Sequence, residues 1–133
     1  MAAHDYLAWM AANTESRWCN DSALFTTIEP ALVAGAIGVT TNPPLTYEAL
    51  TTEPARYEAA LSAIDPSLRA DDRVVQLLGV VVREVAARLH PLWEASEGEL
   101  GFVRCQVQPD AYDDYDAMLA QGLVIAGFGE NVM

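Results

Sequence analysis

The feature that most limits the fold of this chain is a short β-branched segment that two prolines end. Residues 37–41 are mostly apolar or β-branched and suit a buried strand. Pro43 and Pro44 follow closely, and neither can donate a backbone hydrogen bond to a neighbouring strand. The strand must therefore end near Asn42. The pattern predicts a buried strand that stops sharply and leads into a helix.

The same order of strand and helix recurs along the chain. Apolar periodicity and turn residues predict strands at 17–21, 37–41, 102–107 and 131–133. They predict helices at 5–13, 24–35, 45–64, 71–93 and 112–121, with Pro54 breaking or restarting the third of these, and a turn at 127–129. Strands that alternate with helices indicate parallel β/α units. We therefore predict a single α/β domain that spans residues 1–133.

The composition excludes several classes of partner. Hydrophobic residues make up 52% of the 133 residues, which is too apolar for a disordered chain. The formal net charge of −12 argues against binding to nucleic acid or to an anionic membrane surface. Cys19 and Cys105 show no metal-ligand spacing, and no secretory signal is visible. We expect a cytoplasmic protein without a metal or cofactor.

Three polar residues stand where predicted strands end, namely Asp21, Asn42 and Gln106. Each by itself is an ordinary turn or capping residue. The carboxyl ends of parallel strands meet at one edge, which is where β/α barrels hold their sites, so the three together predict a site. Arg104 lies two residues before Gln106 and should face the same side. We expect it to pair with a carboxylate such as Asp21, with a substrate phosphate as the alternative partner.

The segment Gly38–Leu45, GVTTNPPL, resembles the motif that follows the second strand of transaldolases. Three other segments resemble the same family in the right order. Trp18–Ser22 is similar to its first strand, Gly101–Pro109 to its third, and Glu130–Met133 to the start of the strand that carries its lysine. The resemblance implies the N-terminal part of a (β/α)8 TIM barrel, an incomplete barrel with about three to four parallel strands.

The resemblance also implies roles for the strand-end residues. Transaldolases transfer a three-carbon ketol unit between sugar phosphates in pentose phosphate metabolism, through a lysine Schiff base. By this likeness Asp21 is the catalytic acid/base, and Thr40, Thr41 and Asn42 bind the sugar-phosphate substrate. Gln106 stands at a catalytic position where the best-known members carry a glutamate.

The chain departs from the transaldolase pattern at two points that bear on its expected activity. Glutamine at position 106 cannot ionise, and the chain contains no lysine, so no side chain can form a Schiff base. We therefore expect the isolated chain to be an inactive N-terminal part of a transaldolase-like protein. The alternatives are a non-catalytic half-barrel module for binding or assembly, and a split enzyme whose second chain supplies the lysine. An incomplete barrel leaves an open sheet edge, through which we expect a homo-oligomer to form.

Overall fold

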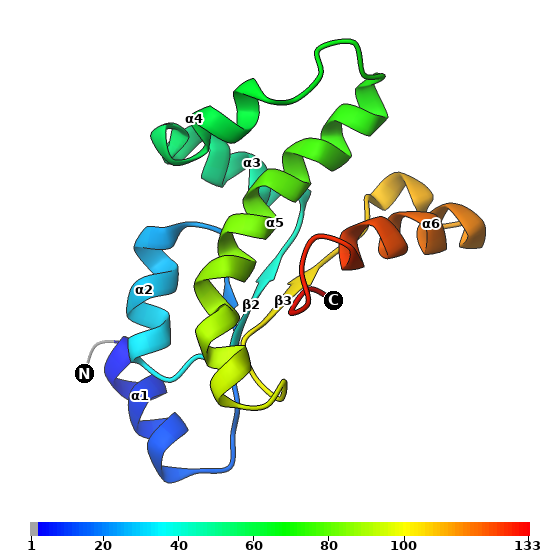
Figure 1. Ribbon diagram of the computed structural model, residues 1–133. Helices are drawn as coiled ribbons and strands as arrows, with labels where there is room; N and C mark the ends of the chain where they lie inside the picture. The colour runs from blue at the N-terminus through cyan, green and yellow to red at the C-terminus, as the bar shows by residue number, and fades with distance from the viewer. Residues whose placement is uncertain (1–2) are drawn as a thin grey trace.

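A computed structural model describes residues 3–133, with side chains described from Asp5 onward except that of Ala111. It contains three parallel strands in chain order: β1 (Asn20–Asp21), β2 (Gly38–Thr41) and β3 (Phe102–Cys105). Figure 1 shows this small sheet with helix α5 lying across it. The predicted parallel order of the strands is confirmed.

The predicted fourth strand is present as one parallel bridge between Val103 and Val132. Backbone hydrogen bonds of 2.9 Å reinforce the bridge, from Val103 N to Asn131 O, from Met133 N to Val103 O and from Cys105 N to Met133 O. The chain at 131–133 therefore extends the sheet beside β3. Among residues 3–133, no strand lies on its other side.

Six α-helices and one 3-10 helix accompany the strands within the described residues. They are α1 (Ala3–Asn13), α2 (Phe25–Val33), α3 (Pro43–Thr52), α4 (Pro54–Ser62), α5 (Ala70–Ala95), η1 (Pro109–Ala111) and α6 (Tyr115–Ala126). The mostly helical segment predicted at 45–64 is two helices, and the predicted break at Pro54 is confirmed, because Glu53 leaves helical geometry before it. The helix predicted at 112–121 instead starts at Tyr115, where Asp114 Oδ1 accepts from Ala117 N at 2.9 Å, and continues to Ala126.

Two predicted strands are shorter than expected. The first covers only Asn20–Asp21 rather than 17–21, although Ile37 N still donates to Trp18 O at 2.9 Å. The third ends at Cys105 rather than at 107. Beyond it the backbone turns away from the sheet, since Gln108 N donates to the side chain of Gln121 in α6. Side-chain acceptors therefore replace the strand ladder earlier than the apolar pattern indicates.

The core lies between α5 and one face of the sheet. Val81, Val85 and Leu89 of α5 are fully buried, as are Val39 of β2 and Val103 of β3. Residues of alternate parity face away from α5, and these include Asp21 and Thr40, which register across β1 and β2. We call this second surface the open face.

Parallel strands in chain order, with crossover helices packed on one side, form an α/β arrangement that matches the first part of a (β/α)8 barrel. The predicted fold class is thereby confirmed. No helix within residues 3–133 combines the length and the apolar character that crossing a membrane requires.

Candidate functional site

The three predicted strand-end residues lie at one edge of the sheet. Asp21 is the last residue of β1, while Asn42 and Gln106 follow the last residues of β2 and β3 directly. Gln106 N donates to Thr41 O at 3.2 Å, which keeps the ends of β2 and β3 together. Asp21 and Gln106 are exposed and Asn42 is partly buried. The edge therefore presents a carboxylate and two amides to one side of the molecule.

Asp21 and Thr40 form the most defined contact of this edge. Thr40 Oγ1 donates to Asp21 Oδ1 at 2.7 Å, and the two residues are register partners in β1 and β2. A hydroxyl donor to an ionised carboxylate makes one of the stronger kinds of hydrogen bond. The bond fixes one carboxylate oxygen on the open face and leaves the other available to a ligand.

Asn42 acts as a helix cap. Its Oδ1 accepts from Leu45 N at 2.9 Å, so it is the N-cap of α3, with Pro43 at the first helical position. Among the described residues the Nδ2 group of Asn42 has no hydrogen-bond partner. The cap orients the side chain and leaves a donor for a ligand.

Thr41 points the other way from Thr40. It is 1% exposed, and its Oγ1 has no hydrogen-bond partner within the described part of the chain. Its side chain lies on the α5 side of the sheet because neighbouring residues in a strand face opposite sides. The structure therefore separates Thr40 and Thr41, and the substrate contact predicted for Thr41 stays a prediction.

The expected ion pair between Arg104 and Asp21 is wrong. No carboxylate of the described residues lies within 4 Å of the Arg104 guanidinium; its Nη1 instead donates to Cys19 Sγ at 3.2 Å. Thr40 is the register partner of both residues, so it stands between them in the sheet. Two strand spacings, about 10 Å, separate Arg104 from Asp21 in the backbone.

A glycine makes this turn of Arg104 possible. A Cβ atom at Gly38 would lie 3.1 Å from Arg104 Nη1 and 2.6 Å from the carbonyl oxygen of Phe102. The guanidinium therefore reaches Cys19 through the space that Gly38 leaves. The sequence did not lead us to predict that Arg104 contacts Cys19 across Gly38. Strand alternation could have indicated Cys19, because it lies two residues before Asp21 and so faces the same side of the sheet.

The second cysteine has a different environment. Burial raises the pKa of the Cys105 thiol to about 11. Its Sγ has only a weak contact, 3.7 Å from the carbonyl oxygen of Gln106. The raised pKa keeps the Cys105 thiol protonated at neutral pH, and the side chain packs against the core.

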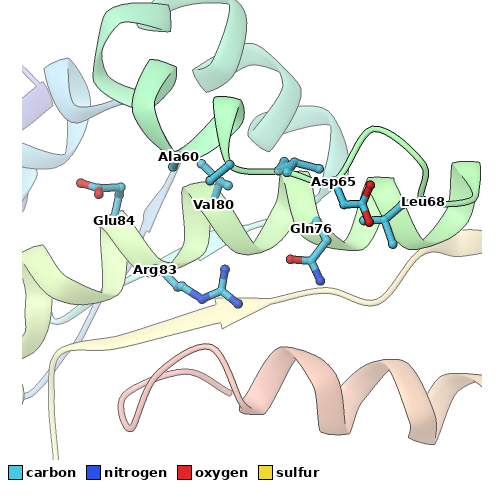
Figure 2. A pocket seen from close by; sticks show the side chains of 9 residues that line it. Ala60, Asp65, Leu68, Gln76, Val80, Arg83 and Glu84 are labelled. Carbon is cyan, nitrogen blue, oxygen red and sulfur yellow. The ribbon is translucent and has the colours of Figure 1, made fainter.

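A pocket lies elsewhere in the molecule, beside α5. Figure 2 shows this pocket of about 450 Å³, bordered by α5 and by the chain that connects it to α4, with Asp65, Gln76, Arg83 and Glu84 among its lining residues. None of the predicted site residues lines it. Arg83 is also engaged with the ring of Phe128, 4.5 Å from its centroid. We therefore place the candidate site at the strand ends and not in this pocket.

The described side chains contain no group of three or more His, Cys, Asp or Glu residues suited to hold a metal ion. The strand ends carry a carboxylate that accepts hydrogen bonds, and a hydroxyl and amides that can both donate and accept them, which suits the hydroxyl and carbonyl groups of a polar ligand.

Parallel strands in chain order, with polar groups at their carboxyl ends, define the class: an α/β protein that matches the first part of a β/α barrel. The family model described as transaldolase/fructose-6-phosphate aldolase matches residues 18–133, and the chain belongs to this family. A search of the curated proteins found no match.

Proposed function

We propose that this chain carries the first part of a transaldolase-type site for a sugar phosphate. In this proposal Asp21 acts as the acid/base, and Thr40, Thr41 and Asn42 bind the substrate. Gln106 occupies the position of a proton-relaying residue, where it can orient a water molecule but cannot take up a proton. The full reaction is the transfer of a three-carbon ketol unit between sugar phosphates.

The observation that carries the proposal is the hydrogen bond from Thr40 to Asp21 at the strand ends. It holds a carboxylate on the open face, and both residues lie within the range 18–133 that the family model matches. The unpartnered Nδ2 group of Asn42 adds a donor one strand away from it. A carboxylate and a donor so placed suit a polyhydroxylated ligand.

The covalent step lies outside what this chain can do alone. The sequence holds seven basic residues, all arginine, and a guanidinium does not become a neutral nucleophile at ordinary pH. A Schiff base requires a primary amine. We therefore propose that these 133 residues bind substrate without forming the covalent intermediate.

A titration followed by NMR tests substrate binding. Fructose 6-phosphate added to ¹⁵N-labelled protein should shift the amide signals of Asp21, Thr40, Asn42 and Gln106, and glucose should shift them less. Asp21→Asn and Asn42→Ala should weaken the effect, while Glu58→Gln on α4 is a matched surface control. Unchanged strand-end signals at millimolar ligand, or shifts confined to the pocket beside α5, contradict the proposal.

Borohydride trapping tests the covalent part. Fructose 6-phosphate and borohydride should leave the mass of every tryptic peptide after the N-terminal one unchanged, because no lysine is present and the remaining primary amine is the α-amino group. A reduced adduct on any side chain contradicts this expectation. Mixing in a second chain that bears the lysine strand, and recovering an adduct on that chain, supports the split-enzyme alternative.

We also propose that the chain assembles with itself through the open edge at 131–133. The adjoining helix α6 supports this, because a stripe of its apolar side chains is exposed: Tyr115 at 76%, Leu119 at 48% and Leu123 at 67%. An exposed apolar stripe beside an unpaired strand marks an association surface. This observation equally favours the non-catalytic assembly module as the second candidate function.

Sedimentation at micromolar concentration measures the assembly. The native chain should sediment as a dimer or larger species, and Leu119→Glu with Leu123→Glu should release monomers. Val33→Glu, at a 90%-exposed apolar position on α2, is the matched control and should not change the assembly state. A stable native monomer contradicts the proposed assembly.

The location proposed for the protein is the cytoplasm. Cys19 and Cys105 are both free thiols, which suits a reducing compartment.

A further inference from the structure

Helix α2 follows the predicted acid/base Asp21 after only three residues, and it has no cap of its own. Its N-cap residue, Leu24, has no side-chain acceptor, and Ser22 Oγ accepts only from Leu24 N, at 3.1 Å. The first amides of a helix need acceptors from outside the helix. Their acceptors are then either water or groups from another part of the chain.

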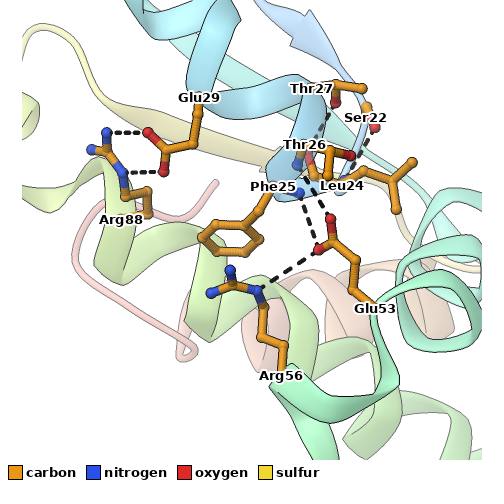
Figure 3. A network of polar contacts seen from close by, with 9 residues as sticks. All are labelled: Ser22, Leu24, Phe25, Thr26, Thr27, Glu29, Glu53, Arg56 and Arg88. Carbon is orange, nitrogen blue, oxygen red and sulfur yellow. Dashed lines mark hydrogen bonds and ion pairs between the residues drawn. The ribbon is translucent and has the colours of Figure 1, made fainter.

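Glu53 supplies such acceptors. Its Oε2 accepts from Phe25 N and its Oε1 from Thr26 N, both at 3.2 Å. Figure 3 shows the carboxylate of Glu53 reaching from the end of α3 to the first turn of α2. A carboxylate that accepts two amides at a helix N-terminus also meets the positive end of the helix dipole.

The position of Glu53 is itself fixed. Arg56 Nε lies 3.7 Å from Glu53 Oε2, and the Arg56 guanidinium stacks 3.6 Å from the centroid of the Phe25 ring. The Glu53 side chain is 14% exposed. The carboxylate is thus held between a cation and the helix end that it caps (Figure 3).

These contacts connect the residues of the candidate site to one another through helices α2 and α3. Asn42 caps the start of α3, and Glu53 stands at the end of the same helix. Glu53 holds the start of α2, and the chain runs back from there to Asp21. Asp21 accepts from Thr40, two residues before Asn42. Helix α3 therefore acts as a strut that links the loop after β2 to the loop after β1.

We propose that Glu53 is a positioning residue that keeps Asp21 in place against Thr40 by capping α2. The inference deepens the proposed function and rests on the role given there to Asp21. Glu53 lies in the helical layer above the strand ends and acts through α2, without contact to the substrate.

The test compares Glu53→Gln with the native chain by NMR. Glutamine keeps the shape but offers one acceptor oxygen, and its amide group cannot accept from the second helix amide. Hydrogen exchange at Phe25 and Thr26 should rise about tenfold, the loss expected when such bonds are removed. The ¹³C signal of the Asp21 carboxyl should move in the same direction as it does in Thr40→Val, which removes the hydrogen bond entirely.

Arg88→Gln provides the matched control. Arg88 makes two hydrogen bonds of 2.6 Å to Glu29 and so anchors the middle of the same helix to α5. This variant should leave the Asp21 carboxyl signal unchanged. An equal shift of that signal in Arg88→Gln, or no shift in Glu53→Gln, overturns the proposal, because Glu53 would then only help to dock α2 in general.

The readouts are independent of catalysis and of substrate. A failed sugar-phosphate titration with a shifted Asp21 signal in Glu53→Gln refutes the proposed function and leaves the positioning role standing. A successful titration with an unmoved Asp21 signal in Glu53→Gln refutes the positioning role alone.

Discussion

Helices α5 and α6 are both crossovers that lead into a strand, yet they pack very differently. Eight residues of α5 are buried, including Val81, Val85 and Leu89, whereas α6 buries only Ile125 among its described residues. In Figure 1, α5 lies across the strands while α6 extends away from them. Helix α6 is on average the more apolar of the two in sequence, so mean composition does not explain why it buries less.

The difference follows from what lies on each side of the helix. Helix α5 connects β2 and β3, which are paired along four residues, and α3 and α4 pack on its other side. Helix α6 leads from β3 to a single bridge at Val132. A helix buries its apolar side only where the elements that should cover it are present. The region around α5 is a finished core, and the region around α6 is a surface.

Truncating one leucine in each helix gives the largest expected contrast. Leu89→Ala should lower the free energy of unfolding by about 2–5 kcal/mol, because it removes a fully buried side chain from the core. Leu123→Ala, at a position 67% exposed in the single chain, should change the free energy of unfolding of the dissociated monomer by less than about 0.5 kcal/mol. Urea unfolding at a concentration where the chain is monomeric measures both, and equal costs would show that Leu123 is covered within the monomer.

A substitution at Gly101, just before β3, tests how tightly this segment packs against the end of α5. Gly101 has φ +78°, and a Cβ there would lie 2.5 Å from Trp93 N and 2.8 Å from Leu89 O. Gly101→Ala should therefore destabilise the protein by about 2–3 kcal/mol, since backbone atoms must shift and the residue is strained. Thermal unfolding gives the value, with Gly122→Ala on α6, which meets nothing within 4 Å, as the control. A neutral Gly101→Ala would mean that the end of α5 is loose.

Raising the pH titrates two groups of the core, Tyr57 and Cys105, that burial holds in their neutral form. Burial raises the pKa of Tyr57 to about 12 and that of Cys105 to about 11. Both groups ionise more readily when unfolded, so stability is fully present below about pH 9 and falls as pH rises toward 12. Each group contributes about 2 kcal/mol to this loss. Phenolate absorbance follows Tyr57, and the rate of alkylation by iodoacetamide follows Cys105. An alkylation profile with its midpoint near pH 9 would show that the end of β3 opens locally.

The surface pair between Arg88 and Glu29 should give the smallest effect. Hydrogen bonding to Arg88 lowers the pKa of Glu29, so the stability it contributes is lost as pH falls through the lowered pKa. Both side chains are more than 40% exposed, so solvent screens the pair. Arg88→Gln should cost about 0.5–1 kcal/mol in urea unfolding at neutral pH, and less in high salt. A cost above about 2 kcal/mol would show that the pair is shielded from solvent, and that α2 packs against α5 as part of the core.

Much of the fold could be predicted from local patterns. The end of β2 before Pro43 and Pro44, the break at Pro54 and the turn at 127–129 all follow from residues that limit backbone geometry or hydrogen bonding. The strand-end positions of Asp21, Asn42 and Gln106 follow from the same kind of strand-ending residues. The lengths of β1 and β3 could not be predicted, because a ladder ends where the partner strand or a competing side chain dictates.

The sequence by itself determined the alternation of strands and helices, the edge at which the polar residues gather and the absence of a lysine side chain within the 133 residues. Only the tertiary structure decided which groups touch. Arg104 reaches Cys19 across Gly38 and not Asp21, and Glu53 caps a helix that begins 28 residues earlier. The physical reason is that spacing along a chain sets which face a side chain takes, whereas its partner depends on strand register and on the room that neighbouring side chains leave.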